Sequence, residues 1–537
     1  MNSKSKAILI SMLIFASILL SGYIGGALAA SEGDGRISNL VIGSDMGDFA
    51  ANMADFNCNY QMIFSHEGLI DYDSNGEVVP RLAESWETTD MKKWIFHLVK
   101  NATWHDGVPF TSKDVKFTME YTRDKKILYG ATTYDIINSI ETPDDYTVIL
   151  NLKEPNAVFL AKLANVPIVI PEHIYAKVDD LKKFTDIDKM FIGTGPYIFD
   201  SYDHAAGIVN FKANDNYWVG KPAIKNIQMR LFKNQDTMMM ALQNGEIDLP
   251  YLYSKGASYY YVPKLMDNKK IKLMTFDSLG IRNTIIFNTQ KKPFDSKDLR
   301  RSMSLAINYE NLMNLMTAGY GSLPNSGLVP KSTKYYTETK PMEYDVEKAK
   351  TQLDRLGFKD KDNDGLREMP DGSKFKPELV VQSSNDESVR ASELIKKDLG
   401  SVGIDLEIKL VDSSTYWKII GEKGHEMILG GLPFWTIKGY KGYYTSIMDS
   451  RNYGWANIND PAYQSIADNL GATMDESKKE KLAEEIQNYY SNELPVIPLY
   501  SMDFIQPYDK KYEGYVTHPM WGVLSLGTFM NLHESEE

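Results

Sequence analysis

A histidine, an aspartate and a serine that could do acid–base chemistry lie close together in one short stretch of this chain. The stretch reads ATWHDGVPFTSKDV and carries His105, Asp106 and Ser112. The same residues are also typical of a turn that leads into a helix. Gly107 permits a positive φ, and Asp106 can accept hydrogen bonds from the following backbone amides. A catalytic loop and a structural turn are therefore both open at this point.

The wider sequence favours the turn. A hydrolase of the α/β type would carry a Gly-x-Ser-x-Gly elbow, and a zinc peptidase would carry His-Glu-x-x-His on a helix. Neither pattern occurs in the chain, and the eight histidines lack the paired spacing of metal ligands. We therefore predict that the protein is not an enzyme.

A second stretch, DKDNDGLREMPD, could bind a metal ion. Asp360, Asp362 and Asp364 match the first, third and fifth positions of a calcium loop, and Gly365 matches the sixth. The twelfth position holds Asp371, where glutamate is usual. Calcium held by these four aspartates would be structural, and a plain solvated turn is the alternative. No other cofactor is expected.

Strand and helix patterns flank the first stretch and would position it. The preceding segment, KKWIFHLVKN, places Trp94, Phe96 and Leu98 on one face, as a half-exposed strand does. The following segment, SKDVKFTMEYT, has helical spacing behind Ser112, which we predict to be the N-cap. We expect a strand, a turn at Asp106–Gly107 and a capped helix.

The rest of the chain alternates strand-like and helical segments. Strands are expected over 39–45, 145–155, 224–233, 283–290 and 405–412. Helices are expected over 234–244, 295–316, 345–358 and 388–404, the first closed by Gly245 and a short return strand, and the second a long amphipathic helix. This alternation predicts α/β domains with mixed sheets.

Composition sets further limits. The chain has 537 residues, 43% hydrophobic and 24% charged, which is typical of a soluble globular protein with two or three domains. Its net charge of -13 argues against a nucleic-acid partner, because phosphates would be repelled. Cys58 is the single cysteine, so an intramolecular disulfide and a thiolate metal cluster are excluded.

The first residues are typical of an export signal. Two lysines in MNSKSK precede the apolar run AILISMLIFASILL, and small residues follow in GGALAA. This layout predicts a signal peptide over 1–29 with cleavage after Ala29. Tyr23 stands where a lipobox carries cysteine, so a lipid anchor is not supported. An uncleaved anchor over 7–28 is the alternative, and both place the body of the protein in the periplasm or at the cell surface.

A series of linked motifs covers nearly the whole mature chain. Between Pro80 and Val115 the pattern is Pro-x-Leu-Ala-x-x-Trp, a strand, and then Trp-His-Asp-Gly-x-Pro-Phe-Thr-x-x-Asp-Val. The later motifs are GTGPYIF, NDNYWVGKPAIKNI, ALQNGEIDL, FNTQKKPFDSKDLRRSMSLAIN, AYQSI and PVIPLY. Together they strongly resemble the extracellular solute-binding proteins of family 5, the receptors of peptide and nickel ABC importers.

The resemblance implies an α/β, two-lobe periplasmic-binding-protein-like fold of type II, cluster C, with an extra subdomain inserted in the N-terminal lobe. It implies a first-lobe core from 37–72, 191–277 and 504–537, an inserted subdomain over 73–190 and a second lobe over 278–503. It also implies that the His-Asp-Gly turn is a structural corner of the first lobe.

The function that the resemblance implies is capture of a solute between closing lobes. The protein would be the extracytoplasmic substrate-binding component of an ABC importer, a monomer that delivers a peptide-like solute to the permease and its ATPase. A nickel chelate or another small solute such as an oligosaccharide is the alternative ligand. A sensor ectodomain is the alternative role, because sensors also close on their ligands.

One stretch departs from the peptide-binding pattern of the family. Peptide-binding relatives carry an aspartate there that pairs with the α-ammonium of the ligand, but HEMILGGLPFWTIKGYKGYYTSI has no carboxylate after Glu426. The aromatic residues that we predict to contact ligand in it are Phe434, Trp435, Tyr440 and Tyr443. Because a buried cation normally has a compensating charge, the stretch favours a neutral, anionic or aromatic-stacked ligand, unless Asp45 or Asp48 supplies the charge.

The nickel-binding branch implies other contacts. Residues in matching regions are Met46, Tyr129, Tyr134 and Trp435. Asn165 stands where that branch has an arginine, which weakens the nickel interpretation. We expect His425, just before a buried strand, to pack in the core rather than to bind a metal.

Overall fold

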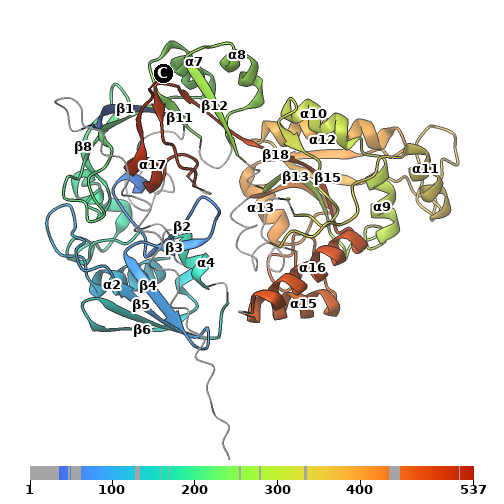
Figure 1. The fold of residues 1–537 in the computed structure, drawn as a ribbon. Coiled ribbons are helices and arrows are strands. Elements are labelled where there is room, and N and C mark those ends of the chain that lie inside the picture. Colours follow the sequence, from blue (N-terminus) through green and yellow to red (C-terminus); the bar gives the residue numbers. More distant parts are fainter. Residues whose placement is uncertain are drawn as a thin grey trace, which may run out of the picture. The chain divides into compact units, whose positions relative to one another are not determined.

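The structure is a computed structural model, shown in Figure 1. It describes residues 35–45, 49, 62–126, 133–157, 159–166, 168–252, 256–276, 280–329, 331, 335–433, 448–473, 475–518 and 521–536. The chain divides into two units, Met1–Arg36 and Ile37–Glu537, and the elements below belong to the second. The predicted signal peptide lies outside the described residues. In the ranges just given, no helix has both the length and the apolar character needed to cross a membrane.

One sheet has five strands in the order β11-β1-β10-β9-β8. Its strands are β1 Ile37–Ser44, β8 Tyr197–Asp203, β9 Ile208–Ala213, β10 Ile224–Leu231 and β11 Leu249–Tyr251. β1 runs parallel to β10 and β11, whereas β9 is antiparallel to β8 and β10. Helix α7, Gln235–Asn244, links β10 to β11 and ends at Gly245 with a φ of 77°. This confirms the predicted helix, its glycine stop and the return strand.

A second sheet is antiparallel, in the order β4-β5-β7-β6. Its strands are β4 Ala83–Thr88, β5 Lys93–Leu98, β6 Ile137–Asp144 and β7 Thr147–Leu152. Helix α2, Ser112–Lys125, packs against β6 and β7. The prediction for β5 is confirmed, because Trp94, Phe96 and Leu98 are all buried on one face.

A third, mixed sheet has six strands in the order β14-β18-β13-β17-β15-β16. Its strands are β13 Gly280–Phe287, β14 Gly321–Ser322, β15 Glu378–Gln382, β16 Glu407–Val411, β17 Met427–Pro433 and β18 Val496–Met502. Both faces are covered, since Ile285 and Phe287 lie in one hydrophobic core and Ile286 lies in another. A strand buried on both faces explains the three consecutive apolar residues, Ile285 to Phe287, that end β13.

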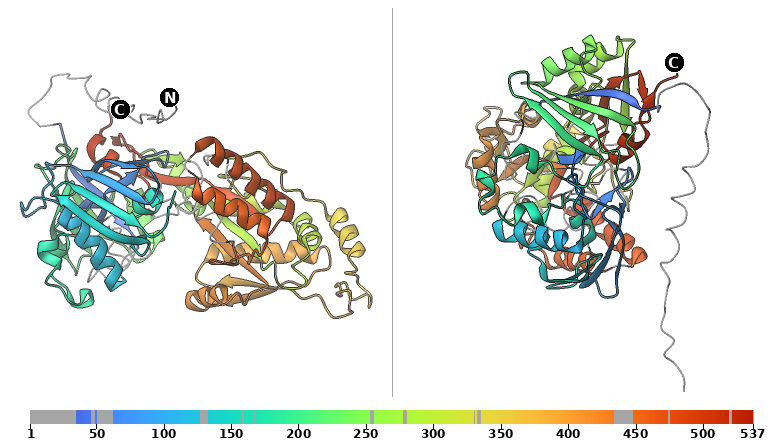
Figure 2. Two further views of the ribbon diagram at one scale, coloured as in Figure 1. Left: turned by 90° about the horizontal axis from the view of Figure 1, so that it is seen from below. Right: turned by 90° about the vertical axis from the view of Figure 1, so that its left-hand side faces the viewer.

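Helices flank this sheet. They are α9 Lys297–Leu305, α10 Tyr309–Thr317, α11 Val346–Arg355, α12 Asp386–Gly400, α13 Ser413–Gly421, α15 Pro461–Ala472 and α16 Glu476–Glu493. In the left view of Figure 2, the orange-red helices α15 and α16 lie against one face, where Tyr463 and Ile486 pack on Ile286.

The prediction of one long helix over 295–316 is wrong, because the helix stops after Leu305. The Asn308 side chain accepts a hydrogen bond from the Asn311 N–H at 3.0 Å and caps a new helix. The Asn308 N–H in turn donates to Asp398 Oδ2 at 2.9 Å, a contact from far along the chain. The apolar spacing continues across this break, so periodicity alone does not reveal it.

Shorter elements complete the described chain. They are η1 Met62–Phe64, β2 Ile70–Tyr72, β3 Val78–Pro80, α4 Phe159–Ala164, α5 Glu172–Tyr175, η2 Leu181–Lys183, α6 Ile187–Met190, η3 Tyr259–Tyr261, α8 Val262–Met266, β12 Ile271–Phe276, β19 Phe504–Asp509, β20 Tyr512–Glu513, α17 Leu526–Asn531 and β21 His533–Glu534.

A two-stranded ribbon connects the five-stranded region to the six-stranded sheet. β12 and β19 pair antiparallel in this ribbon, and the strands next to them along the chain, β13 and β18, pair in the six-stranded sheet. Asp503 alone separates β18 from β19. The main chain therefore crosses between the two regions on two neighbouring strands.

The buried cores follow the sheets. Every strand of the six-stranded sheet comes from 280–502, and every strand of the four-stranded sheet comes from 83–152. The core under the five-stranded sheet also contains Ile168, Tyr175 and Met190, which the sequence places in the inserted subdomain. The predicted domain limits remain predictions, and this shared core is why the limit near residue 190 is hard to place from sequence.

Candidate functional site

The His-Asp-Gly stretch is a tight turn. Gly107 has a φ of 87°, and the Val108 N–H donates to Asp106 Oδ1 at 3.2 Å. Asp106 Oδ2 lies 2.8 Å from His173 Nε2, which holds the turn against helix α5. The aspartate therefore bonds within its own turn and to a neighbouring helix.

His105 is held by backbone groups on both ring nitrogens. Its Nδ1 accepts a hydrogen bond from the Gly193 N–H at 3.3 Å, and its Nε2 lies 3.0 Å from the Gly195 carbonyl oxygen. Nδ1 also lies 3.3 Å from the Phe191 carbonyl oxygen, and burial lowers the pKa of His105, which favours the neutral ring. These contacts support the structural turn over the catalytic loop.

Helix α2 begins one residue earlier than predicted. Thr111, and not Ser112, is the N-cap, and its backbone N–H donates to Asp114 Oδ2 at 2.9 Å. The Ser112 hydroxyl instead donates to the Asp144 carbonyl oxygen at 2.6 Å. Adjacent threonine and serine can both cap a helix, and only the backbone geometry decides between them.

A buried carboxylate that the sequence analysis missed joins two distant motifs. Glu67 accepts hydrogen bonds from Tyr217 Oη at 2.6 Å, Trp218 Nε1 at 2.8 Å and Thr194 Oγ1 at 3.1 Å. Burial raises the pKa of Glu67, whereas the three donors favour the charged form. The signal was available in HEGLI, because an acid beside a buried apolar strand must be surrounded by donors.

A second ionic group ties the C-terminal segment to the β2–β3 hairpin. Asp71 accepts from Arg81 Nη2 at 2.9 Å, and its other oxygen lies 2.8 Å from His518 Nε2. The Trp521 N–H donates to His518 Nδ1, so the proton on Nε2 is the one that His518 donates to Asp71. Although burial opposes ionisation, His518 and Arg81 hold the pKa of Asp71 well below its usual range.

These groups line a small hollow of about 50 Å³. Its polar wall contains Glu67, Asp71, Arg81 and His518, and its apolar wall contains Trp521. Because these polar groups already bond to other groups of the protein, the hollow is suited to ordered water at a structural junction rather than to a charged ligand.

The glycines of GTGPYIF allow backbone segments to touch. A Cβ on Gly193 would lie 1.8 Å from the Ser65 carbonyl oxygen, and a Cβ on Gly195 would lie 2.7 Å from the Ser65 carbonyl carbon. The Gly195 N–H donates to that same oxygen at 2.8 Å. The motif therefore brings the entry to β8 against the segment that carries Glu67.

We expect Gly193→Ala to lower the free energy of unfolding by about 2–4 kcal/mol, because a backbone carbonyl must move to admit the methyl group. Gly400→Ala is the control, since no atom lies within 4 Å of its added Cβ and the residue ends helix α12. Urea unfolding measures both, and equal stability of the two variants would contradict the close packing.

His66 is a buried base beside this junction. It is 4% exposed, its Nδ1 lies 2.9 Å from Ser65 Oγ, and its Nε2 has no partner among the described residues. Burial, followed by the nearby His105, lowers the pKa of His66 to about 3. A free histidine titrates near ~6.5. Its neutral form therefore stabilises the fold above that pH, and this stability is lost as the pH falls toward the folded-state pKa.

From this shift we expect His66 to cost about 2 kcal/mol of stability at pH 5 relative to pH 7.5. His66→Gln should flatten the fall of stability with pH in that window, whereas His97→Gln, at a histidine that is 44% exposed, should leave it unchanged. Chemical unfolding at several pH values gives the slopes. The same slope in His66→Gln and the wild-type protein would show that His66 is not responsible.

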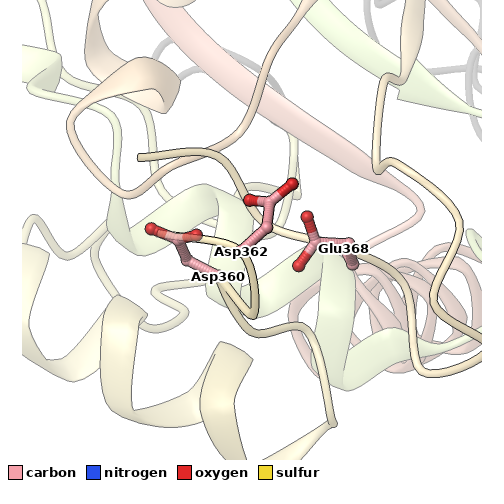
Figure 3. A group of neighbouring side chains, drawn as sticks. All are labelled: Asp360, Asp362 and Glu368. Carbon is pink, nitrogen blue, oxygen red and sulfur yellow. The ribbon is translucent and has the colours of Figure 1, made fainter. Parts of the chain in front are cut away.

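The acidic stretch at 360–371 is exposed over 360–365, whereas Arg367 and Glu368 are buried. Figure 3 shows Asp360, Asp362 and Glu368, each of which offers a carboxylate oxygen within 4.8 Å of the others. Asp371 instead accepts hydrogen bonds from the Ser373 N–H at 2.9 Å and from its hydroxyl at 2.6 Å. The assembled group therefore contains Glu368, and of the four predicted ligands it contains Asp360 and Asp362 but neither Asp364 nor Asp371.

The Lys374 ammonium group already lies among these carboxylates. Its Nζ is 2.7 Å from Asp362, 2.5 Å from Asp364 and 3.1 Å from Glu368. Carboxylate oxygens are the ligands that calcium prefers, so the donor set fits the ion, but the lysine must move aside for it. Calcium therefore stays a prediction.

We expect Lys374→Ala to increase the rise in melting temperature that millimolar calcium produces, because the variant leaves the carboxylates without their ammonium partner. The measurement is thermal unfolding with calcium and with a chelator. If neither the wild-type protein nor the variant responds to calcium, the calcium prediction is wrong and the stretch is a solvated turn.

The carboxyl ends of the parallel strands mark one candidate binding edge. Asp45 follows β1 and Asp236 lies in the first turn after β10, so both lie at the same edge of the five-stranded sheet. The Tyr261 hydroxyl donates to Asp236 Oδ1 at 2.5 Å. Burial and the carboxylates of Asp236 and Asp45 raise the pKa of Tyr261. Ligands of open α/β sheets bind outside such carboxyl ends.

The six-stranded sheet has a corresponding edge. β15, β16 and β17 are parallel, and the carboxyl ends of β15 and β16 lead into α12 and α13. In the first turn of α12, Glu387 Oε1 accepts from Asn283 Nδ2 at 3.0 Å and from Tyr500 Oη at 2.9 Å. The first residue of β13 pairs with the last of β17, so the connecting ribbon enters the sheet at this same edge.

Most predicted ligand contacts fall outside the described residues. These are Met46, Tyr129, Phe434, Trp435, Tyr440 and Tyr443, together with Asp48. The described ones are Asp45, which follows β1, Asn165, which follows α4, and Tyr134. The predicted site therefore remains a prediction.

Tyr134 and Asn165 differ in what they offer to a ligand. Tyr134 is 3% exposed and lies in the hydrophobic core of the four-stranded sheet, so its ring supports packing. Asn165 follows α4, its Nδ2 donates to the Ala161 carbonyl oxygen at 3.0 Å, and its Oδ1 has no partner among the described residues. His425 is fully buried with Nε2 2.7 Å from the Trp455 carbonyl oxygen, which fits the predicted packing role.

Two α/β regions joined by a ribbon of crossing strands, each presenting the carboxyl ends of parallel strands, define a two-lobe solute-binding protein. The model of the bacterial extracellular solute-binding proteins, family 5, middle region, matches residues 77–454, which is more than half of the chain. The chain belongs to this family.

Known relatives support the assignment. The chain is 26% identical over 499 residues to heme-binding protein A of Haemophilus influenzae, covering 86% of each chain. It is 26% identical over 475 residues to the dipeptide-binding protein of Escherichia coli, covering 83% of this chain and 84% of that one. NikA from Brucella suis, solved with Fe(III)-EDTA, has a TM-score of 0.81 at 20% identity and covers 93% of this chain and 100% of that one.

These similarities confirm the predicted fold class, an α/β two-lobe fold of the periplasmic-binding-protein type. The family consists of extracellular solute-binding proteins, which work outside the cytoplasm. They act together with the permease and ATPase subunits of ABC importers.

Proposed function

We propose that this protein captures a peptide-like solute between its lobes and delivers it unchanged to an ABC permease driven by an ATPase. The observation that carries the proposal is family membership over residues 77–454, joined to a fold in which the connecting ribbon enters one of two ligand-binding edges. A ligand that contacts both edges would stabilise the closed form through its higher affinity for that form.

The polar groups of the described residues support binding rather than catalysis. The histidine and aspartate of the His-Asp-Gly stretch are engaged by backbone and neighbouring side chains. Glu67 and Asp71 are saturated by donors from the protein itself. Such groups hold the lobe together, so we propose that the solute leaves chemically unchanged.

A peptide is the favoured solute because an acidic edge is available for its amino end. Asp45 lies at the carboxyl edge of the five-stranded sheet and could supply the charge that the 425–447 stretch lacks. Relatives named for dipeptides and for di- and tripeptides agree with this choice.

Export is part of the same proposal. The predicted signal peptide over 1–29 would carry the chain across the membrane, either with cleavage after Ala29 or with the apolar segment kept as an anchor. The mature protein would then work as a monomer that meets its permease at the membrane surface.

A thermal-shift screen of residues 30–537 tests the proposal. Short peptides of mixed sequence should raise the melting temperature, because a ligand that binds the folded state stabilises it. Nickel–histidine, heme and oligosaccharides are the competing probes. A shift with one of these and none with peptides would replace the peptide assignment, and turnover of a bound peptide would refute the binding role itself.

For the predicted contacts, Trp435→Ala should weaken binding of the active peptide by about 1–3 kcal/mol if the ring stacks on it. Asp45→Asn should weaken the binding of peptides with a free amino end more than the binding of N-acetylated peptides. Asp298→Asn is the control, because Asp298 lies in the first turn of α9, which follows the opposite end of β13. Calorimetric titration measures the affinity of each variant for the peptide. An affinity equal to that of the wild-type protein would show that the substituted residue does not contact the ligand.

A further inference from the structure

On the β18–β19 side of the connecting ribbon, a single residue separates the two strands. β12 pairs with β19 as far as Phe276 and Phe504, and β13 pairs with β18 from Ile281 and Ser501. Asp503 belongs to neither strand. When two lobes rotate on a pair of crossing strands, the backbone change falls on the few residues between the strands. Asp503 is therefore placed where rotation would occur.

The backbone of Asp503 is held from both sides. Its carbonyl oxygen accepts a hydrogen bond from Tyr259 Oη at 2.6 Å, and its N–H donates to the Tyr320 carbonyl oxygen at 3.4 Å. Tyr259 is buried in a core with Met239 of α7, on the side of the five-stranded sheet. Tyr320 precedes β14, which pairs with β18 in the six-stranded sheet.

The two tyrosines also touch each other. Their rings stack with centroids 6.0 Å apart and planes 22° apart. The Tyr320 hydroxyl lies 3.3 Å from Met266 Sδ on α8, a second contact with the five-stranded side. Since Tyr259 belongs to one lobe and Tyr320 to the other, rotation at Asp503 would change the ring contact and both hydrogen bonds together.

We propose that Tyr259 and Tyr320 form an aromatic clasp across the crossover that limits rotation of the lobes about Asp503. The clasp consists of the stacked rings, the two hydrogen bonds to Asp503 and the contact with Met266. It acts as a conformational brake that solute-driven closure must work against. It depends on the two-lobe fold and not on the identity of the solute.

The test measures the distance between the lobes in the protein without added solute. Spin labels are attached at Lys113→Cys on α2 and Lys481→Cys on α16, exposed positions in the two lobes, in a Cys58→Ser background. Pulsed electron resonance then gives the distribution of distances. Because no ligand is needed, the outcome is independent of whether the solute is a peptide.

We expect Tyr320→Ala to broaden or shift the distribution clearly, because it removes the ring and the Met266 contact. Tyr259→Phe removes only the hydrogen bond to Asp503 and should give a smaller change. Tyr344→Leu is the matched control, an exposed tyrosine of the same lobe that has no part in the clasp, and it should match the parent protein.

Identical distributions in the parent protein and Tyr320→Ala would overturn the proposal. If Tyr320→Ala does not fold, Tyr320→Phe and Tyr259→Phe decide, since both keep the rings and each removes one hydroxyl contact. A parent-like distribution in both of these would likewise reject the clasp, whereas a change in either supports it.

Discussion

The antiparallel pairing that continues from β12–β19 into β13–β18 is the constraint on which the rest of the structure depends. Backbone hydrogen bonds between two paired strands resist shear and separation of the strands. Relative movement of the regions that they join is therefore confined to the place where the pairing is interrupted, at Asp503. That break lies beside the carboxyl edge of the six-stranded sheet. In the proposed function, the crossover and a candidate binding edge share one location, so a bound solute would act directly on closure.

Rigidity of the first lobe is the second requirement, because a clamp transmits ligand contact into rotation only if each half moves as one body. Buried polar networks supply this rigidity. Glu67 gathers donors from two motifs more than a hundred residues downstream, and Asp71 links the β2–β3 hairpin to the C-terminal segment through His518. A buried carboxylate without such partners would be strongly unfavourable, so each network enforces the docking of the segments that supply its donors.

Much of the local structure could be predicted from residue patterns. The alternation of apolar and polar residues predicted β5, Gly245 predicted the end of α7, and the series of motifs predicted the family. The predictions of helix ends were wrong where two neighbouring residues could both cap the helix, or where a residue far along the chain determined where the helix ends. Threonine and serine competed for the cap of α2, and the break between α9 and α10 depends on a cap that a distant aspartate supports. Glu67 was missed because its donors are remote in sequence.

By itself the sequence determined the class of protein, because period-2 and helical apolar patterns, turn residues and motif order are all local or linear properties. It also determined which residue types were available for solute contact. Only the tertiary structure decided which carboxylates are engaged internally, that Tyr134 faces a core, that Lys374 lies among the acidic groups of the 360–371 turn, and that two tyrosines meet at Asp503. The physical reason is that burial and pairing are properties of surroundings, and those surroundings come from parts of the chain far apart in sequence.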